Sequence, residues 1–216
     1  MIQLSNISKS FGSLQVLKNI DLTIAKGEIV SITGASGAGK TTLLNIMGTL
    51  ERADSGQILI NNQDVSQMND KEISIFRNKH IGFVFQFHNL LAEFSAMENA
   101  ILPSLIYNNN KEQAKERVNE LFSILGIEDK KDSYPNELSG GEQQRVAIVR
   151  SLINSPSIVL ADEPTGNLDS TNARSLFDLF FLLREKLNQT FVVVTHAKEL
   201  SDLCDRQLVI KDGKII

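Results

Sequence analysis

The chain is organised around the stretch Gly34-Ala35-Ser36-Gly37-Ala38-Gly39-Lys40-Thr41-Thr42, which follows the pattern G-x-x-x-x-G-K-T. Residues 28–33, directly before it, are mostly apolar and β-branched, which is typical of a buried strand. Residues 43–47, directly after it, fit a helix with one apolar face. A glycine-rich turn between a strand and a helix is the context that a phosphate-binding loop needs, and this context disfavours a chance glycine turn.

The residue types in this loop suit the phosphates of a nucleotide. Gly34, Gly37 and Gly39 let the backbone curl so that its N–H groups converge on phosphate oxygens. The N-terminus of the following helix adds a partial positive charge. We expect Lys40 to bridge the β- and γ-phosphates and Thr41 to place its hydroxyl on Mg²⁺.

The composition is that of an ordinary globular protein with a full hydrophobic core. The 216 residues are 42% hydrophobic and 22% charged, with a net charge of −4. Because there is no long basic run, a general nucleic-acid-binding protein is disfavoured. No apolar run approaches the roughly 18–20 residues of a membrane-spanning helix, so a membrane role requires a partner. The single cysteine, Cys204, excludes an intrachain disulfide and fits a reducing cytoplasm.

The N-terminal part of the chain is expected to form short strands, and the middle part to form helices. Strand patterns occupy residues 2–32, with turns at Gly12 and Gly27, and Phe11 either packs on the sheet or stacks on a purine ring. Residues 87–137 fit a helical insertion, with helices over 97–106 and 111–125 and a break at Asn108-Asn109-Asn110. At its entrance lies an apolar cluster that serves either core packing or partner docking, formed by Phe87, Leu90, Leu91 and Phe94.

A second glycine-rich helix start follows at Leu138-Ser139-Gly140-Gly141-Glu142. Ser139 and Glu142 have the spacing of a capping box, which is a purely structural interpretation. That interpretation leaves Gly140 and Gly141 unexplained, and glycines at a helix N-terminus leave backbone N–H groups accessible to an anion. The segment therefore predicts a second phosphate-binding site.

Carboxylates and a histidine follow buried strands in the last third of the chain. Asp162 and Glu163 follow the apolar run 157–161, where we expect Asp162 to hold Mg²⁺ and Glu163 to deprotonate the attacking water. A turn at Gly166-Asn167-Leu168-Asp169 comes next, then a helix over 171–187 and a strand over 191–195 that ends at His196. Because the carboxyl ends of parallel strands meet at one edge, Gly34, Gln86, Asp162 and His196 are expected to face one nucleotide.

These motifs, in this order and over essentially the whole chain, resemble an ATP-binding-cassette (ABC) ATPase. The resemblance implies an α/β P-loop NTPase fold with a mixed-sheet core, an N-terminal antiparallel β subdomain and an inserted helical subdomain. It implies one domain over residues 1–216, in which 1–86 and 157–216 form the core and 87–156 the helical, signature-bearing part.

The resemblance also implies roles for single residues, with ATP and Mg²⁺ as cofactors. Phe11 is expected to stack on adenine, Gln86 to sense Mg²⁺ and the γ-phosphate, and His196 to hold the γ-phosphate. The resemblance implies an ATP-bound head-to-tail homodimer. In it, the signature residues Ser139, Gly140 and Gly141 are expected to contact the ATP of the opposite subunit, and Asp169, the last residue of the turn, is expected to lie across the same interface.

A finer resemblance rests on residues 85–94 with Glu98 and Asn99, which are similar to the ATPases of bacterial lipoprotein-releasing systems. Asn89 and Ala92 depart from that pattern, where His and Pro are common. Macrolide or peptide exporter ATPases and the cell-division ATPase share nearly every catalytic motif and remain alternatives. The resemblance implies permease subunits docking near residues 86–107 at the cytoplasmic face of the inner membrane, and no nucleic acid.

Overall fold

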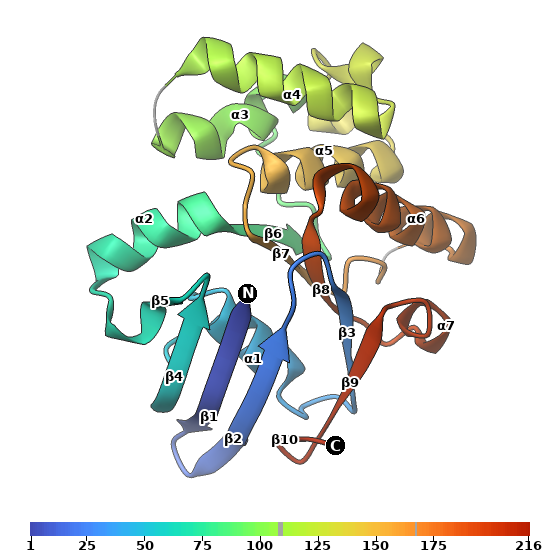
Figure 1. Ribbon diagram of the computed structural model, residues 1–216. Helices are drawn as coiled ribbons and strands as arrows, with labels where there is room; N and C mark the ends of the chain where they lie inside the picture. Colours follow the sequence, from blue (N-terminus) through green and yellow to red (C-terminus); the bar gives the residue numbers. More distant parts are fainter. Residues whose placement is uncertain (108–109, 167) are drawn as a thin grey trace.

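The computed structural model describes residues 1–107, 110–166 and 168–216, and it contains two sheets with different strand directions (Figure 1). The N-terminal sheet is antiparallel, with the order β2-β1-β4-β5. The larger sheet has the order β10-β9-β3-β8-β7-β6 and is parallel except for β10. The strands span β1 (Ile2–Phe11), β2 (Leu14–Ile24), β3 (Ile29–Thr33), β4 (Ser55–Ile60), β5 (Gln63–Asp64), β6 (Ile81–Phe85), β7 (Ile158–Asp162), β8 (Thr190–Val194), β9 (Arg206–Lys211) and β10 (Lys214–Ile215).

Helices pack on both faces of the larger sheet, and α3, α4 and α5 pack on one another in the layer at the top of Figure 1. This confirms the α/β fold with a mixed sheet, an N-terminal antiparallel sheet and an inserted helical part. The helices span α1 (Lys40–Met47), α2 (Asp70–His80), α3 (Ala96–Tyr107), α4 (Lys111–Leu125), α5 (Gly140–Leu152), α6 (Ser170–Leu187) and α7 (Lys198–Ser201), with short 3-10 turns η1 (Val65–Gln67), η2 (Glu128–Lys130) and η3 (Pro135–Glu137).

The two faces of the parallel strands belong to two hydrophobic clusters, which explains why their sequences are apolar without alternation. In β7, Ile158 and Leu160 pack with α1 and the N-terminal sheet, whereas Val159 and Ala161 pack with helices α3 to α6. A strand that is covered on both faces buries every side chain, as β8 does. The site-bearing strands are therefore fixed from both sides.

Some elements differ from the sequence-based expectation. Of the short strands predicted over residues 2–32, those up to residue 24 join into two long strands, β1 and β2. Left-handed Asn6 and Asn19 lie at two of the three register shifts between these strands. The very short β5 and β10 were not predicted, since two residues carry no periodicity. The break between two helices was predicted at Asn108-Asn109-Asn110. Of these residues, Asn108 and Asn109 lie outside the described part of the chain, and Asn110 caps α4.

Candidate nucleotide-binding site

The phosphate loop connects β3 to α1 and folds around the side chain of Lys40. The Lys40 Nζ donates hydrogen bonds to the carbonyl oxygens of Gly34 and Ala35, both at 3.0 Å, and the residue is 6% exposed. The helix α1 begins at Lys40, directly after Gly39, which has a φ of 105°. The loop thus holds its ammonium group against two of its own carbonyl oxygens, at a helix N-terminus. The positive charge and the helix N-terminus together suit an anion.

Close packing requires glycine at two positions of this loop. A Cβ on Gly34, whose φ is 147°, would lie 2.2 Å from the carbonyl oxygen of Ile210 in β9. A Cβ on Gly39 would lie 2.8 Å from a methyl group of Leu17 in β2. The loop is therefore pressed against β2 and β9, which with it line a hollow of about 510 Å³.

The hydroxyl of Thr41 and the carboxylate of Asp162 meet at the carboxyl end of the parallel strands. Thr41 Oγ1 donates to Asp162 Oδ1 at 3.3 Å, although the two residues are far apart in sequence. Burial raises the pKa of Asp162, and the Thr41 hydrogen bond and the charge of Lys40 partly oppose this effect. The pair offers hard oxygen ligands, which Mg²⁺ prefers.

Glu163 lies against His196 in a backbone conformation that is unusual for a residue with a side chain. Its φ is 45°, and its N–H donates to the carbonyl oxygen of Val194 at 3.0 Å. The Glu163 Oε1 lies 3.1 Å from His196 Nε2, and the His196 N–H donates to Oε2 at 3.3 Å. Among the described residues, the buried Oε1 has no hydrogen bond of good geometry. Burial raises the pKa of Glu163, and the nearby His196 opposes this shift.

The structure brings together the four residues that were expected at one sheet edge. The parallel strands β3, β6, β7 and β8 are neighbours in one sheet, and they end at or just before Gly34, Gln86, Asp162 and His196. The side chain of Gln86 lies against Gly166, because a Cβ on Gly166 would come 2.7 Å from Gln86 Nε2. Asn167, which belongs to the same predicted turn, lies outside the described residues.

Phe11 ends β1, and its side chain is 49% exposed. The Lys9 Nζ lies 5.2 Å from the centre of its ring, within the range of a cation–π contact. Phe11 is not among the described residues that line the hollow beside the phosphate loop. About half of the residue therefore stays open for stacking.

The signature segment and Asp169 belong to a different part of the molecule, at the starts of α5 and α6. Ser139 and Glu142 form the predicted capping box, with Ser139 N–H donating to Glu142 Oε2 at 2.7 Å. A Cβ on Gly140 or Gly141 would meet nothing within 4 Å. Asp169 is exposed and caps α6 by accepting from Asn172 N–H at 2.8 Å. Within the described part of the chain, no hydrogen bond links these residues to the phosphate loop.

Sequence reasoning assigned no role to two side chains that order the loop after Gln86. The Asn99 side chain is fully buried and donates to the carbonyl oxygens of Leu91, Phe94 and Ser95 at 2.9–3.1 Å. Arg150 of α5 donates to the carbonyl oxygens of residues 88 and 89, both at 2.7 Å. A buried asparagine in an apolar helix was the available sequence signal, because such a group needs hydrogen-bond partners.

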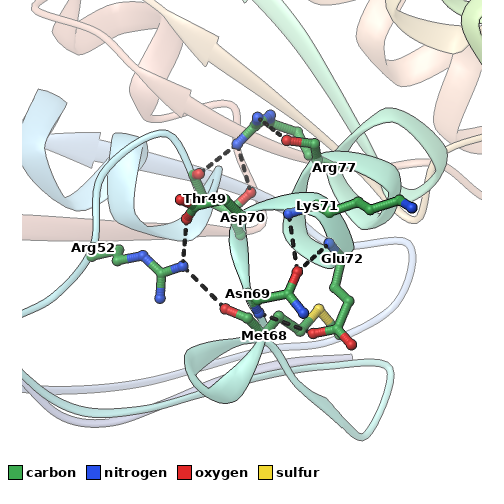
Figure 2. Close-up of polar contacts among 9 residues, drawn as sticks. Thr49, Arg52, Met68, Asn69, Asp70, Lys71, Glu72 and Arg77 are labelled. Carbon is green, nitrogen blue, oxygen red and sulfur yellow. Dashed lines mark hydrogen bonds and ion pairs between the residues drawn. The ribbon is translucent and has the colours of Figure 1, made fainter.

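A second network that the sequence did not reveal joins the end of α1 to α2 (Figure 2). Arg77 donates to the carbonyl oxygen of Thr49 at 2.6 Å, and Arg52 pairs with Asp70 at 2.9 Å. Arg77 also lines a groove of about 440 Å³ between α2 and α3, together with Leu50, Phe83, Phe85, Ile106 and Arg150 among others. This network fixes the groove relative to the helix that carries the phosphate loop.

Among the described residues, the structure contains neither a membrane-spanning helix nor a cluster of metal-binding side chains. No helix there has the length and apolar character that crossing a membrane requires. The same residues contain no group of three or more His, Cys, Asp or Glu side chains placed to hold a metal ion.

Comparison with known proteins gives consistent matches along the whole chain. The family model described as "ABC transporter" matches residues 17–166. The lipoprotein-releasing system ATP-binding proteins LolD of Cytophaga hutchinsonii and Bacteroides thetaiotaomicron are 55% and 57% identical, over 100% of this chain and 99% of each relative. A dimeric structure of the bacterial ABC transporter cassette MJ0796 has a TM-score of 0.88 and 39% identity, over 100% of this chain and 96% of that one. A post-hydrolysis dimer of the same cassette, bound to ADP and Pi, has a TM-score of 0.87 with the same identity and coverage. With a family model that matches more than half of its length, this chain belongs to the ABC transporter family.

Proposed function

We propose that this chain is the ATP-hydrolysing subunit of a membrane complex that releases lipoproteins. The observation that carries the proposal is the identity above one half, over the full length, to proteins named for that system. The chemistry at the sheet edge supports the ATPase part. A buried lysine in a glycine-rich loop serves the phosphates, and a half-buried carboxylate beside a histidine serves the attacking water.

Mg²⁺ fits this edge, since Thr41 and Asp162 present a hydroxyl and a carboxylate oxygen 3.3 Å apart. When bound, the ion supplies charge that neutralises the phosphate oxygens. Thr41 is the expected direct ligand, Asp162 and Gln86 are expected to act mainly through water, and Lys40 holds the β- and γ-phosphates. Glu163 is the general base, because its raised pKa makes the carboxylate more basic and its Oε1, which has no hydrogen bond of good geometry among the described residues, can accept a proton from water. His196 orients Glu163 and holds the γ-phosphate.

The nucleotide site is shared between two copies of the chain in this proposal. Ser139, Gly140, Gly141 and Asp169 contact the ATP bound by the opposite subunit, in a head-to-tail dimer that ATP stabilises. Two features support this arrangement. The two signature glycines have open space beside them, and the similar MJ0796 cassette is described as dimeric. Contact with the γ-phosphate then favours the closed dimer, and hydrolysis removes that preference.

Permease subunits dock, in this proposal, near residues 86–107, which places the chain peripherally on the cytoplasmic face of the inner membrane. The groove between α2 and α3 lies beside this segment, and the exposed apolar side chains Phe87, Leu91 and Ile106 are 68%, 45% and 77% exposed. Of these three, Ile106 lines the groove, and exposed apolar side chains next to a groove are typical of a protein-binding surface. Asn99 and Arg150 hold the loop after Gln86 rigid, so a movement of the bound permease subunit is transmitted to Gln86.

Affinity purification from membranes of the native host, with ATP present, tests the lipoprotein assignment. Tagged Glu163→Gln protein is the bait, and Lys40→Ala, which is expected to lose nucleotide binding, is the matched control. We expect the bait, more than the control, to recover paired membrane subunits together with lipid-modified proteins, as identified by mass spectrometry. Recovery of a drug exporter, or of a division-site protein with a cell-wall hydrolase and no lipoproteins, would contradict the assignment while leaving the ATPase intact.

A further inference from the structure

An unpaired carboxamide is buried between α5 and α6. Gln144 is 2% exposed, and among the described residues neither its Oε1 nor its Nε2 has a hydrogen-bond partner. A buried polar group without a partner lowers stability, and an apolar residue of the same size would avoid that loss. The neighbouring Gln143, in contrast, donates to the carbonyl oxygens of Pro135 and Leu138.

Gln144 lines a small void of about 30 Å³ that separates the two helices. On the α6 side, the void is bounded by two polar residues, Asn172 and Ser175, whose side chains bond to their own helix segment. Asn172 Nδ2 donates to Asp169 Oδ2 at 2.8 Å, and Ser175 Oγ donates to the carbonyl oxygen of Thr171 at 3.0 Å. Asn172 therefore holds Asp169 in the structure, while Gln144 has no partner across the void.

The positions of the two carboxamides connect both segments that the proposed dimer uses. Gln144 follows Gly141 by three residues on α5, and Asn172 follows Asp169 by three residues on α6, so each lies on the same helix face as an interface residue. A carboxamide has both a donor and an acceptor, so two of them can form a reciprocal pair.

We propose that Gln144 and Asn172 pair in the ATP-bound dimer, and that Asn172 becomes free for this pair when Asp169 turns to the partner subunit. The proposal rests on the proposed function, which places Asp169 at the dimer interface. Gln144 is then a positioning residue: its pairing locks the signature helix α5 to the start of α6 only when the dimer is closed. The unpaired amide destabilises the open monomer relative to the closed state, which favours closure.

Gln144→Leu tests this exchange of hydrogen-bond partners, in which Asn172 leaves Asp169 and pairs with Gln144. The proposal predicts opposite effects of the variant on monomer stability and on dimerisation. In the nucleotide-free full chain, the melting temperature is expected to rise by about 2–4 °C, since a buried unpaired group is removed. In the Glu163→Gln background with ATP and Mg²⁺, sedimentation velocity is expected to show roughly tenfold weaker dimerisation. Asn172→Ala is expected to weaken the dimer as well, and the double variant to be no weaker than the single variants.

Gln143→Leu is the matched control for stability, and it is expected to lower the melting temperature because it removes three hydrogen bonds, to Pro135, Leu138 and His88. Gln144→Met repeats the test with a flexible side chain if Gln144→Leu folds poorly. An unchanged or lower melting temperature for both Gln144 variants would indicate a resident water or another partner in the monomer and would overturn the proposal. Unaltered dimerisation, or additive effects with Asn172→Ala, would also overturn it. If the Glu163→Gln parent forms no dimer with ATP, the shared site itself is wrong, and the exchange fails with it.

Discussion

The two glycine-rich helix starts of this chain are packed in opposite ways. At the start of α1, a Cβ on Gly34 would lie 2.2 Å from a β9 carbonyl oxygen, and one on Gly39 would lie 2.8 Å from Leu17. At the start of α5, a Cβ on Gly140 or Gly141 would meet nothing within 4 Å. Glycine is thus required by the chain's own packing in the first segment, whereas nothing within the described chain requires it in the second.

The contrast extends to the side chains around the two segments. Lys40, Thr41, Asp162, Glu163 and His196 contact one another or their own backbone. Ser139 caps only its own helix, as Asp169 does on α6. A segment whose glycines are not required by the packing of its own chain is suited to close approach by another molecule. The comparison therefore agrees with a site of which one half is assembled within each chain and the other half is supplied by a second copy.

The largest expected effect comes from Glu163, which belongs to the half of the site that is assembled within each chain. Glu163→Gln should lower the rate of ATP hydrolysis by roughly 10²–10⁴, about 3–5 kcal/mol of barrier, because the general base is lost. ATP binding should persist. Phosphate release and nucleotide binding measure the two properties, with Glu185→Gln, exposed on α6, as control. Near-normal turnover would remove Glu163 from its proposed role.

The half of the site that a second copy supplies is tested most strongly by a bulky charged side chain at position 139, in place of Ser139. Ser139→Arg should leave nucleotide binding by the monomer unchanged and weaken ATP-driven dimerisation by more than about 100-fold, roughly 2.7 kcal/mol or more. Sedimentation in the Glu163→Gln background measures this effect. Ser123→Arg, at an exposed position of α4, is the control for an added charge. Dimers that form normally with Ser139→Arg would show that the site is not shared.

Alanine at one glycine of each segment tests the contrast directly, and the two variants should change stability in opposite directions. Gly34→Ala should cost on the order of 1–3 kcal/mol, because its φ of 147° and the Ile210 carbonyl leave no room. Gly141→Ala should stabilise the monomer by up to about 1 kcal/mol, since alanine favours helix, while it weakens the ATP-bound dimer. Thermal unfolding and sedimentation are the measurements. A destabilised Gly141→Ala monomer would show that this glycine has an internal role.

The smallest expected effect is the pH dependence that Asp162 confers on stability. Burial raises its pKa in the folded chain, so the folded state binds more protons than the unfolded state between the two pKa values. Stability is therefore lost as the pH rises through the folded pKa, and the penalty is fully present at neutral pH. Asp162→Asn should melt higher than the wild type at pH 7–8 without nucleotide or metal, and the difference should shrink toward pH 4. A difference that grows on acidification would contradict the assigned shift.

Local sequence signals predicted the elements that carry a full period or a full motif. The phosphate loop between strand and helix, the capping box at Ser139 and the helices on either side of residues 108–109 were all predictable, because each depends on residues close in sequence. The length of β1 and β2 was not, since their pairing continues through three register shifts, two of them at left-handed asparagines. The structural roles of Asn99 and Arg150 were not predicted, because their partners are backbone carbonyl groups of the loop after Gln86.

By itself, the sequence determined the family, the order of the longer strands and helices, and the residues whose chemistry suits phosphate, metal and water. Those properties follow from residue type and short-range spacing. Only the tertiary structure decided that Thr41 meets Asp162, that Glu163 has a left-handed backbone beside His196, and that Gln144 is buried without a partner among the described residues. Each of these depends on how β7, β8 and the helices pack, and packing between distant segments is set by the burial of apolar surface rather than by local pattern.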